Sequence, residues 1–504
     1  MTVPPGGDPG ATQPAAAAAG GSAAADEAPA PPHSPAALAA RHGDRWRWRM
    51  LLTVMIGSIA SVMSSTIVNV AVPDLIRHFG IGQERAQWVA AGFMTAMTLA
   101  MLPTPWLLAR WGYRRAYMGA VGLLTAGGVA GGLGTTYGFV LAMRVAEGLA
   151  AGVLQTIPAI IILRAFGPGE RGRAMGIFGF GVVLAPAVGP SVGGVLVEHF
   201  GWRSIFFFVL PFGLWALWLA RRCLPAVAPG GAPPAGRDAP LDALGLALAA
   251  VGIVGLLEGL VHLHGASWQT PALLIGTGLA AIAGFLRHEA RTPQPLLDLR
   301  LFRARPFAMG ALVAFSYGMG LFGSTYLVPV FMQTALGYPP STAGAALLPA
   351  GLVLAATIPL GGRMADIVAP RKLVAAGVAL LALSFALMAT IGPATGLVLL
   401  MLWAVVGRIG LGLVLPSLTL GSVVGLDARA VPQAASVISF VRQLGGAVGV
   451  SLVGIFLEWR LRVRALEGAG ALAGFADTFW LVAALTAAAL AAALRMRAAD
   501  GRER

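Results

Sequence analysis

Apolar segments of about 20 residues recur along the chain from Met50 onward, and short charged runs separate them. A helix of that length crosses roughly 30 Å of hydrocarbon, so each segment predicts a membrane-spanning helix. We expect about fourteen spans, and therefore an all-α, polytopic membrane protein. They are placed at residues 48–72, 86–108, 115–134, 137–163, 173–198, 203–220, 241–263, 271–287, 306–331, 343–362, 372–392, 395–421, 432–457 and 476–495.

The basic residues test this placement. With the N-terminus inside, 26 of the 35 Arg and Lys residues fall on inside segments, six on outside loops and three within spans. Because basic residues favour the cytoplasmic side, both termini are predicted to be cytoplasmic. Arg460, Arg462 and Arg464 fall on an outside loop, where we expect an amphipathic extension of the thirteenth span.

Composition narrows the class of protein. The chain is 57% hydrophobic and 11% charged, whereas soluble domains carry about a quarter charged residues. A single cysteine excludes a disulfide framework, and the histidines show no ligand spacing beyond His262 and His264, so no metal site is expected. The net charge of +14 comes from arginines that punctuate apolar runs instead of forming one basic patch, so nucleic-acid binding is not expected.

Energy-coupling and catalytic motifs are absent from the sequence. No Gly-x-x-x-x-Gly-Lys-Ser/Thr phosphate loop occurs, which argues against an ATP-driven pump. The spans hold no cluster of histidines and acids of the kind that a membrane enzyme would need. The chain is therefore expected to be neither an enzyme nor a cofactor-binding protein.

Two parts of the chain repeat each other. VGPSVGGVLVE (188–198) matches VGVSLVGIFLE (448–458), and ARWGYRRAYMGAVGLL (109–124) resembles DIVAPRKLVAAGVALL (366–381). Arg144-x-x-x-Gly148 is echoed by Arg408-x-x-x-Gly412. Transporters are commonly built from such parallel halves around a central site. Chance similarity between Gly-rich apolar helices is the alternative explanation.

The fifth span carries small residues at a four-residue spacing, which lays them along one helix face and lets another helix approach closely. They are Gly181, Ala185, Gly189 and Gly193. Pro186 and Pro190 lie beside them, remove two backbone donors and are expected to bend the helix. The copy near 436–458 lacks these prolines, so we expect two related but unequal helices at the interface between the halves.

Several segments together resemble the fourteen-helix drug:proton antiporters of the major facilitator superfamily. They are STIVNVAVPDL (65–75), RGRAMGIFG (171–179), APAVGPSVGG (185–194), GWRSIFFFVLPFG (201–213), LGYPPSTAGAALLPAG (336–351) and FVRQLGGAVGVSLVG (440–454). The resemblance implies the major facilitator fold, two six-helix bundles with two inserted helices. It also implies efflux of amphipathic drugs or toxic small molecules across a bacterial inner membrane by alternating access, with the proton gradient as energy source and no cofactor.

The resemblance gives the expected organisation of the chain. It consists of a disordered Ala/Pro/Gly-rich cytoplasmic tail (1–44), an N-terminal six-helix bundle (45–222), a cytoplasmic linker (223–240), two inserted transmembrane helices (241–290), a cytoplasmic loop (291–305), a C-terminal six-helix bundle (306–497) and a tail (498–504). The implied partners are the lipid bilayer and a small-molecule substrate, with a periplasmic adaptor and an outer-membrane channel as further partners.

The chain departs from the family pattern in three places. Ser64 stands where the first span usually has an acid, two residues before Thr66. The loop motif after the second span has Ala109 in place of its usual aspartate. The fourth span has Glu147 where an amide is usual. Two alternatives to multidrug efflux are open. One is an exporter of one endogenous metabolite or siderophore, and the other, suggested by the lost first-span acid and loop motif, is a non-transporting sensor on a transporter scaffold.

Charged residues inside spans are the candidates for proton coupling, because a charge at mid-membrane costs about 3 kcal/mol or more and commonly marks a pathway. Arg144 and Glu147 are three residues apart and share a helix face, so they could pair. We hypothesise that Glu147 carries the coupling proton; a static ion pair is the alternative. Glu258, four residues before His262, is a second candidate. The alternative is that Glu258 and His262 form a pair at the outer membrane interface.

Polar and aromatic side chains within the spans are candidates for the substrate cavity, with packing or locking of the two halves as the alternative role. They are Ser64, Thr66, Asn69, Tyr317, Tyr326, Gln333, Arg442 and Gln443. The resemblance also implies a cytoplasmic charge clasp that holds one transport state. Its expected residues are Arg114, Arg115, Arg363 and Asp366.

Overall fold

The computed structural model describes residues 43, 45–227, 229, 240–264, 268–392, 395–468 and 470–496. Every regular element in these residues is a helix, which confirms the all-α class. The tails expected at 1–44 and 498–504 lie outside the described residues, apart from Gly43, and so does most of the expected linker at 223–240.

The helices follow the apolar segments of the sequence. The first half of the chain forms α2 (Trp46–Phe79), α3 (Gln83–Met101), α4 (Thr104–Trp111), α5 (Tyr113–Gly132), α6 (Tyr137–Ala165), α7 (Arg171–Phe200), α8 (Ser204–Phe207) and α9 (Val209–Cys223). Next come α10 (Ala243–Val261), the 3-10 helix η1 (His262–His264) and α11 (Gln269–Glu289). The second half forms η2 (Leu299–Arg303), α12 (Arg305–Thr334), α13 (Pro340–Ala365), α14 (Pro370–Ala389), α15 (Leu397–Ser422), α16 (Val431–Leu466) and α17 (Ala471–Leu494).

Twelve of the described helices are long and apolar enough to cross a membrane, or thirteen if α3 and α4 form one bent span. The remaining expected span, 115–134, corresponds to α5. This helix is 20 residues long, but it is rich in glycine and begins with Arg114 and Arg115. Its composition therefore does not place it among the apolar spans, although it packs between α6 and α9.

The second span is broken, which corrects the continuous helix expected at 86–108. The axes of α3 and α4 meet at an angle of 59°. The break falls at Leu102 and Pro103, and Pro105 follows in the first turn of α4. Proline has no backbone N–H and clashes with the preceding helical turn, so two prolines at this point end one helix and begin another.

Helix α16 continues past residue 457 as the expected extension, 36 residues long in all. The arginines of this extension are paired with acids. Arg460 Nε lies 2.9 Å from Asp477 Oδ2 on α17, and Arg464 Nε lies 2.8 Å from the same oxygen. Arg462 pairs with Glu458 one turn before it. The three basic residues that disagree with the positive-inside pattern are therefore neutralised locally.

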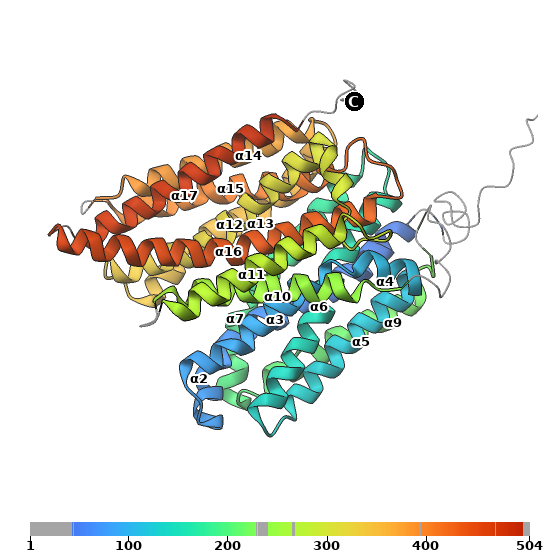
Figure 1. The fold of residues 1–504 in the computed structure, drawn as a ribbon, viewed down its shortest axis with the longest axis horizontal. Helices are drawn as coiled ribbons and strands as arrows, with labels where there is room; N and C mark the ends of the chain where they lie inside the picture. The colour runs from blue at the N-terminus through green and yellow to red at the C-terminus, as the bar shows by residue number, and fades with distance from the viewer. Residues whose placement is uncertain are drawn as a thin grey trace, which may run out of the picture.

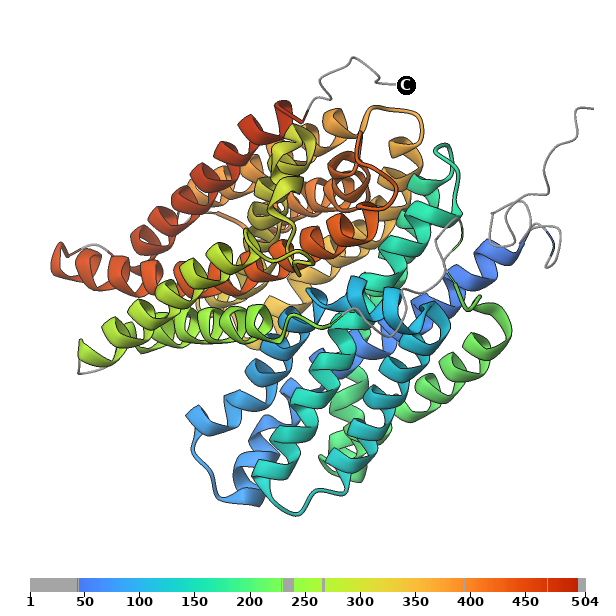
Figure 2. The ribbon, with the colours of Figure 1, turned by 45° about the vertical axis from the view of Figure 1, so that its right-hand side comes forward.

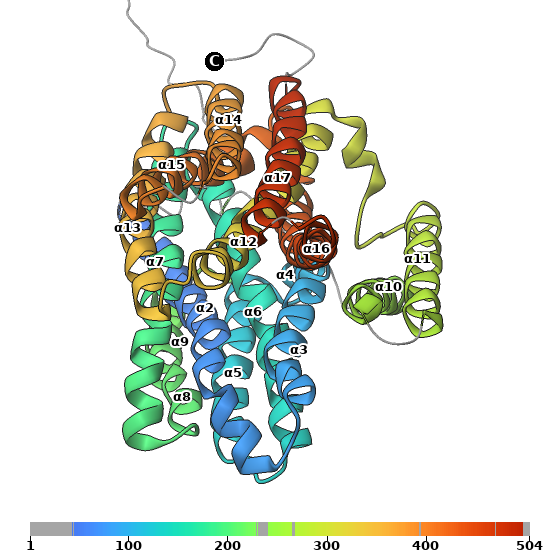
Figure 3. The ribbon, with the colours of Figure 1, turned by 90° about the vertical axis from the view of Figure 1, so that its left-hand side faces the viewer.

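The helices pack in two matching groups, α2–α9 and α12–α17 (Figure 1). Helix α2 contacts α6, α7 and α9, and α12 contacts α15, α16 and α17 in the same order. The pairs α5–α6 and α3–α6 correspond to α14–α15 and α13–α15. Helices α10 and α11 pack on each other and lie to one side of both groups (Figure 3).

The two groups meet at the end of the molecule where α2 begins and α17 ends, here called the terminal end, and spread apart away from it (Figures 1 and 2). Helix α7 packs on α13 across the boundary, and α16 packs on α3 and α6. Near the terminal end, Arg164 Nη2 donates to the Ala428 carbonyl (3.3 Å), and Ser436 Oγ donates to the Met101 carbonyl. The structure is therefore closed at the terminal end.

Candidate proton and substrate site

Glu147 on α6 is fully buried, and its side chain contacts α2 and α5. Two glycines of α5 make room for its side chain. A Cβ added at Gly127 would lie 3.0 Å from Glu147 Cγ, and one at Gly128 would lie 3.0 Å from Glu147 Oε1 and 2.9 Å from the Phe206 carbonyl oxygen of α8. A larger residue at either position would push against the carboxyl group.

The Arg144 guanidinium binds Glu147 and ties three helices together. Arg144 Nη1 forms an ion pair with Glu147 Oε2, and it also lies 2.8 Å from Ser64 Oγ on α2. Nη2 donates to the Ser64 carbonyl (3.2 Å), and Nε donates to the Val89 carbonyl on α3 (3.3 Å). The guanidinium carbon also lies 4.3 Å from the centre of the Phe93 ring, within cation–π distance.

Ser64 closes the cluster. Its hydroxyl oxygen lies 3.3 Å from Glu147 Oε2, so α2 and α6 share one small network of a cation, an anion and a hydroxyl. Arg144 and Glu147 are 1% and 0% exposed. Such a pair is stable in a dry interior only because each charge neutralises the other and further hydrogen bonds satisfy the guanidinium.

One oxygen of this network remains unused. Within the described part of the chain, Glu147 Oε1 is buried and has no hydrogen-bond partner. Buried polar atoms are usually paired, and an unpaired one is costly unless it has a functional role. Oε1 can accept a proton without displacing Arg144 from Oε2, so the geometry suits reversible protonation.

The sequence predicted the Arg144–Glu147 pairing from its three-residue spacing, and the structure contains that ion pair. The parts contributed by α3 and α5 were not predicted. The adjacent glycines Gly127 and Gly128 were a usable signal, because glycines in an apolar span often mark a close approach. Val89 acts through its backbone carbonyl and left no signal in the sequence.

The predicted cavity residues do not form one group. Ser64 belongs to the buried network, whereas Thr66 is half-buried with its hydroxyl donating to the Val62 carbonyl (3.1 Å). Gln443 is buried, and its Nε2 lies 3.8 Å from Met94 Sδ across the boundary between the halves. Three candidates are exposed side chains away from this network. They are Asn69, Tyr326 and Gln333.

Two other candidates lie close together in the second half. A Cβ at Gly318 would collide with the Arg442 carbonyl, so α12 and α16 touch backbone to backbone beside Tyr317. Tyr317 is buried and Arg442 is half-buried. Glu258 lies near the end of α10, where its Oε2 is 3.8 Å from His262 Nδ1.

The small-residue stripe of α7 faces its own half, which corrects its expected place at the interface between the halves. Added Cβ atoms at Gly181, Gly189 and Gly193 would meet Met55, Thr66 and Ile67 of α2 at 2.6–2.9 Å. Ala185 is buried and the Pro186 side chain is exposed, while the Pro190 side chain lies outside the described residues. Helix α7 continues from residue 171 to 200 through both prolines.

Other glycines of α7 make the contact with the second half. A Cβ at Gly176 would lie 3.0 Å from the Ile358 carbonyl of α13, and one at Gly172 would collide with the Gly362 carbonyl. The periodic stripe of small residues thus correctly predicted a close helix contact, but its partner is α2 and not a helix of the second half. The partner could not be predicted because α7 packs on α2 with one face and on α13 with another.

Asp366 joins the two halves at the terminal end through backbone N–H groups. Its Oδ1 accepts from Gly172 N (2.6 Å) and its Oδ2 from Arg173 N (2.8 Å), at the start of α7. A carboxylate at a helix N-terminus satisfies free donors and complements the helix dipole. Arg363 is exposed at the end of α13. The contact found is thus a carboxylate on a helix end, not a pair of opposite side-chain charges.

Arg114 and Arg115, the other basic residues of the predicted clasp, lie apart from Asp366 at the start of α5. Arg114 Nε donates to the Leu224 carbonyl after α9 (2.6 Å), and Arg115 is exposed. Ala109, the repeat counterpart of Asp366, lines a cavity of about 1740 Å³ at the terminal end together with Gln433 of α16. Ala109 has no carboxylate that could bind α16 as Asp366 binds α7. Gln433 Nε2 donates to the Pro295 carbonyl (2.8 Å) of the loop before α12. A carboxylate therefore joins the halves on the α7–α13 side, whereas the α3–α16 side is joined by the hydrogen bond from Ser436 to the Met101 carbonyl.

Comparison with known proteins places this site in a family. The chain is 32% identical over 426 residues to the multidrug resistance protein B homolog of Mycobacterium tuberculosis (strain ATCC 25618 / H37Rv), covering 83% of this chain and 78% of that protein. It is 27% identical to the tetracenomycin C resistance and export protein of Streptomyces glaucescens, covering 86% and 80% of the two chains.

A solved structure shows the same fold at lower sequence similarity. The proton:xylose symporter XylE superimposes with a TM-score of 0.62 at 14% identity, over 88% of this chain and 94% of that one. The family model of the Major Facilitator Superfamily matches residues 54–450. On that match and on the 32% identity to a family relative, the chain belongs to the Major Facilitator Superfamily.

Proposed function

We propose that this chain exports amphipathic drugs or toxic small molecules across a bacterial inner membrane in exchange for protons, with Glu147 as the proton-binding group. Its relatives include a multidrug resistance protein homolog and a tetracenomycin C resistance and export protein. In a cell with an outer membrane, the exported molecule would leave through a periplasmic adaptor and an outer-membrane channel.

The observation that carries the proposal is the buried network of Arg144, Ser64 and Glu147 with one unused carboxylate oxygen. When Glu147 is ionised, its charge balances Arg144, and the guanidinium holds α2 and α3 against α6. A proton on Glu147 weakens the ion pair and leaves Arg144 to its weaker partners. The network thus has two charge states that differ in how firmly three helices are joined.

A route from this network to the boundary between the halves runs along α3. Phe93 lies under the Arg144 guanidinium, and the next residue, Met94, contacts Gln443 of α16. A change in the Arg144 contacts therefore acts on a helix that also touches the second half. Proton binding and substrate binding would each favour one transport state, which is the thermodynamic requirement for exchange.

We assign the terminal end to the cytoplasm, because the predicted inside segments carry most of the basic residues. On this assignment the structure is closed toward the cytoplasm, with Asp366 on the N-terminus of α7 as the clasp. Its release would accompany opening to the inside. Arg114 and Arg115 at the start of α5 would have supporting roles in this gate, whereas the exposed Arg363 at the end of α13 would contribute little to it.

Everted membrane vesicles that contain the full chain test the proposal. Their lumen is acidified, and accumulation of a panel of cationic, neutral and anionic amphipathic dyes is followed by fluorescence. Wild type should accumulate several dyes, a protonophore should abolish accumulation, and Glu147→Gln should do the same. Glu258→Gln is the matched control for an acid in another span, and it should transport as wild type.

The same assay can contradict the proposal in two ways. Gradient-driven accumulation by Glu147→Gln at the wild-type rate would exclude Glu147 as the proton carrier. Failure of wild type to move any dye of the panel would count against multidrug export and favour a dedicated exporter or a sensor.

A further inference from the structure

Helix α15 repeats the arrangement of α6 without its acid. Gly148, four residues after Arg144, packs against the Phe93 carbonyl of α3, since an added Cβ would collide with it. Gly412, four residues after Arg408, packs in the same way against α13, where an added Cβ would lie 2.7 Å from Thr357 Cβ. Because α13 is the counterpart of α3, Arg408 occupies the place of Arg144.

The partner of Arg144 on α2 also has a counterpart. Gly189 of α7 packs on Thr66, and its repeat, Gly449 of α16, packs on Met319 of α12. Thr66 and Met319 are therefore equivalent positions. Two residues before each stand Ser64 and Tyr317, so the Tyr317 hydroxyl replaces the Ser64 hydroxyl in the second half.

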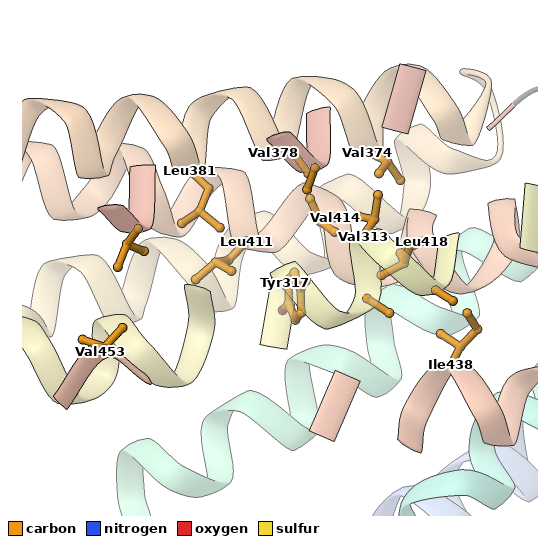
Figure 4. Packing of buried hydrophobic residues seen from close by; sticks show 14 of the residues in the cluster. Val313, Tyr317, Val374, Val378, Leu381, Leu411, Val414, Leu418, Ile438 and Val453 are labelled. Carbon is orange, nitrogen blue, oxygen red and sulfur yellow. The ribbon is translucent and has the colours of Figure 1, made fainter. Parts of the chain in front are cut away.

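The third member of the network is missing. The residue equivalent to Glu147, three positions after Arg408, is Leu411, which is 1% exposed. Leu411 and Tyr317 lie in one buried cluster on the neighbouring helices α15 and α12 (Figure 4). The first half thus holds a neutral Arg–Glu pair, and the second half holds an arginine with an apolar residue in place of its acid.

Arg442 on α16 adds a second positive charge beside Tyr317. Helix α12 packs on α15, which carries Arg408, and Gly318, the residue after Tyr317, packs on the Arg442 carbonyl of α16. Among the described residues, neither arginine has an ion pair or hydrogen bond from its side chain, and the Tyr317 hydroxyl has no hydrogen-bond partner although the residue is 3% exposed. Three side chains with strong hydrogen-bond donors therefore lie on three helices that contact one another, α12, α15 and α16.

No carboxylate of the second half is placed to neutralise these arginines. The five acids between residues 306 and 496 are engaged near helix ends: Asp366 with α7, Asp427 with the Arg429 N–H, Glu458 with Arg462, and Asp477 and Glu467 with Arg464. Uncompensated charges within spans are expensive, and they commonly line a pathway or meet an ion of opposite charge. Helices α15 and α16 both contact the first half, so they border the route between the halves.

We propose that Arg408, Tyr317 and Arg442 form a subsite for an anionic group, a carboxylate or sulfonate, of the exported molecule. This inference rests on the proposed function and names its preferred substrate class, amphipathic anions. Arginine suits this role because its guanidinium stays charged and donates several hydrogen bonds to one oxyanion. Tyr317 adds a neutral donor, and the surrounding apolar cluster accepts the rest of the molecule.

Equilibrium binding of two matched probes to the full chain in lipid nanodiscs tests this subsite. 8-Anilinonaphthalene-1-sulfonate carries a sulfonate, and N-phenyl-1-naphthylamine is the same skeleton without it. At constant ionic strength, wild type should bind the sulfonate more tightly than the neutral probe. Arg408→Gln and Arg442→Gln should each reduce that preference about tenfold, which is the worth of one charged hydrogen bond.

Three further variants make the test specific. Leu411→Glu restores the acid of the first half and should abolish the preference by occupying Arg408. Arg408→Lys keeps the charge and should retain most of the preference, so a loss in Arg408→Gln cannot be ascribed to misfolding. Arg462→Gln removes an exposed arginine at the far end of α16 and should match wild type.

An equal affinity of wild type for both probes would overturn the inference, and so would an unchanged preference in both glutamine variants. Either result leaves the proposed export function standing if the vesicles still accumulate dyes in a Glu147-dependent manner. Conversely, a preference that depends on Arg408 and Arg442 in nanodiscs supports the subsite even where vesicles show no gradient-driven transport.

Discussion

The hydroxyl oxygen of Ser64 lies 3.3 Å from Oε2 of Glu147, although 83 residues separate the two in the chain. Ser64 stands where the family resemblance leads one to expect an acid on the first span, and Glu147 stands where it leads one to expect an amide. The missing acid and the additional acid are therefore neighbours in space. Both positions contact Arg144: Ser64 Oγ lies 2.8 Å from its Nη1, and Glu147 forms an ion pair with the same nitrogen.

This relationship predicts that the acid can be moved back. Ser64→Asp combined with Glu147→Gln places a carboxylate on α2 within reach of Arg144, whose Nη1 already lies 2.8 Å from Ser64 Oγ. The double variant should recover much of the gradient-driven export that Glu147→Gln loses. Initial rates in everted vesicles measure this.

The control for that exchange is Ser64→Asp alone. It puts two carboxylates against one guanidinium, and like charges in one site cannot both stay ionised, so the single variant should export more slowly than wild type. A double variant as inactive as Glu147→Gln would mean that the position of the acid on α6, and not merely its contact with Arg144, is required.

Removing only the cation should destabilise the fold more than removing both charges. Arg144→Gln leaves the buried Glu147 carboxylate without a counter-charge, and breaking a buried pair in this way costs about 3 kcal/mol or more. Glu147→Gln combined with Arg144→Gln removes both charges and should be more stable than Arg144→Gln alone. Thermal unfolding of the purified protein in one detergent provides the comparison.

The contrary outcome would be a double variant no more stable than the single one. The guanidinium contacts with the Ser64 and Val89 carbonyls would then account for the loss, and the charge pair would contribute little.

The glycines behind Glu147 should resist even a methyl group. Gly128→Ala places a Cβ 3.0 Å from Glu147 Oε1 and 2.9 Å from the Phe206 carbonyl, and such overpacking costs about 1–3 kcal/mol. We expect a lower unfolding temperature and slower proton-coupled export. Gly119→Ala and Gly122→Ala on the same helix meet nothing within 4 Å and should be neutral or slightly stabilising.

If the three alanine variants behave alike, the close contact at Gly128 does not limit this site.

The clasp at the terminal end should set the balance between transport states. Asp366→Asn removes the negative charge that accepts the Gly172 and Arg173 N–H groups. Loss of a charged hydrogen bond should shift the equilibrium toward the state open at that end by about tenfold or more. Spin labels at Gly169→Cys and Ile367→Cys, in a Cys223→Ser background, report the separation of the two halves.

Arg363→Gln is the matched variant one turn away, because Arg363 is exposed and has no partner found among the described residues. It should leave the distance distribution close to wild type. If the distance distribution shifts more in Arg363→Gln than in Asp366→Asn, a clasp between opposite side-chain charges explains the closed state better than the contact of Asp366 with the N-terminus of α7.

The sequence could predict what depends on local spacing. Apolar run lengths placed the spans, and the three-residue interval brought Arg144 and Glu147 onto one face of α6. The sequence could not predict which residues of different helices contact each other. The contact of Ser64 with Glu147, and the choice of α2 instead of the second half as the neighbour of Gly189, depend on how helices are rotated against one another.

Helix rotation is hard to infer here for a physical reason. A helix in water shows its buried face through an apolar stripe, whereas a span between lipid and protein is apolar all round. Contacts made through backbone groups leave no pattern in the sequence, because every residue carries the same N–H and C=O. The Gly172 N–H that binds Asp366 and the Val89 carbonyl that binds Arg144 are examples. Pro103 and Pro105, which break the second span, were a local signal of that break.

Proton release on substrate binding reports directly on Glu147 as the proton-binding group. Purified full-length protein in weakly buffered detergent solution is mixed with a dye that the vesicles export, and a pH indicator follows the solution. Wild type and Glu258→Gln should acidify the solution as the substrate displaces the proton from Glu147, and Glu147→Gln should bind the dye without acidification. Equal acidification by Glu147→Gln and wild type would contradict the account.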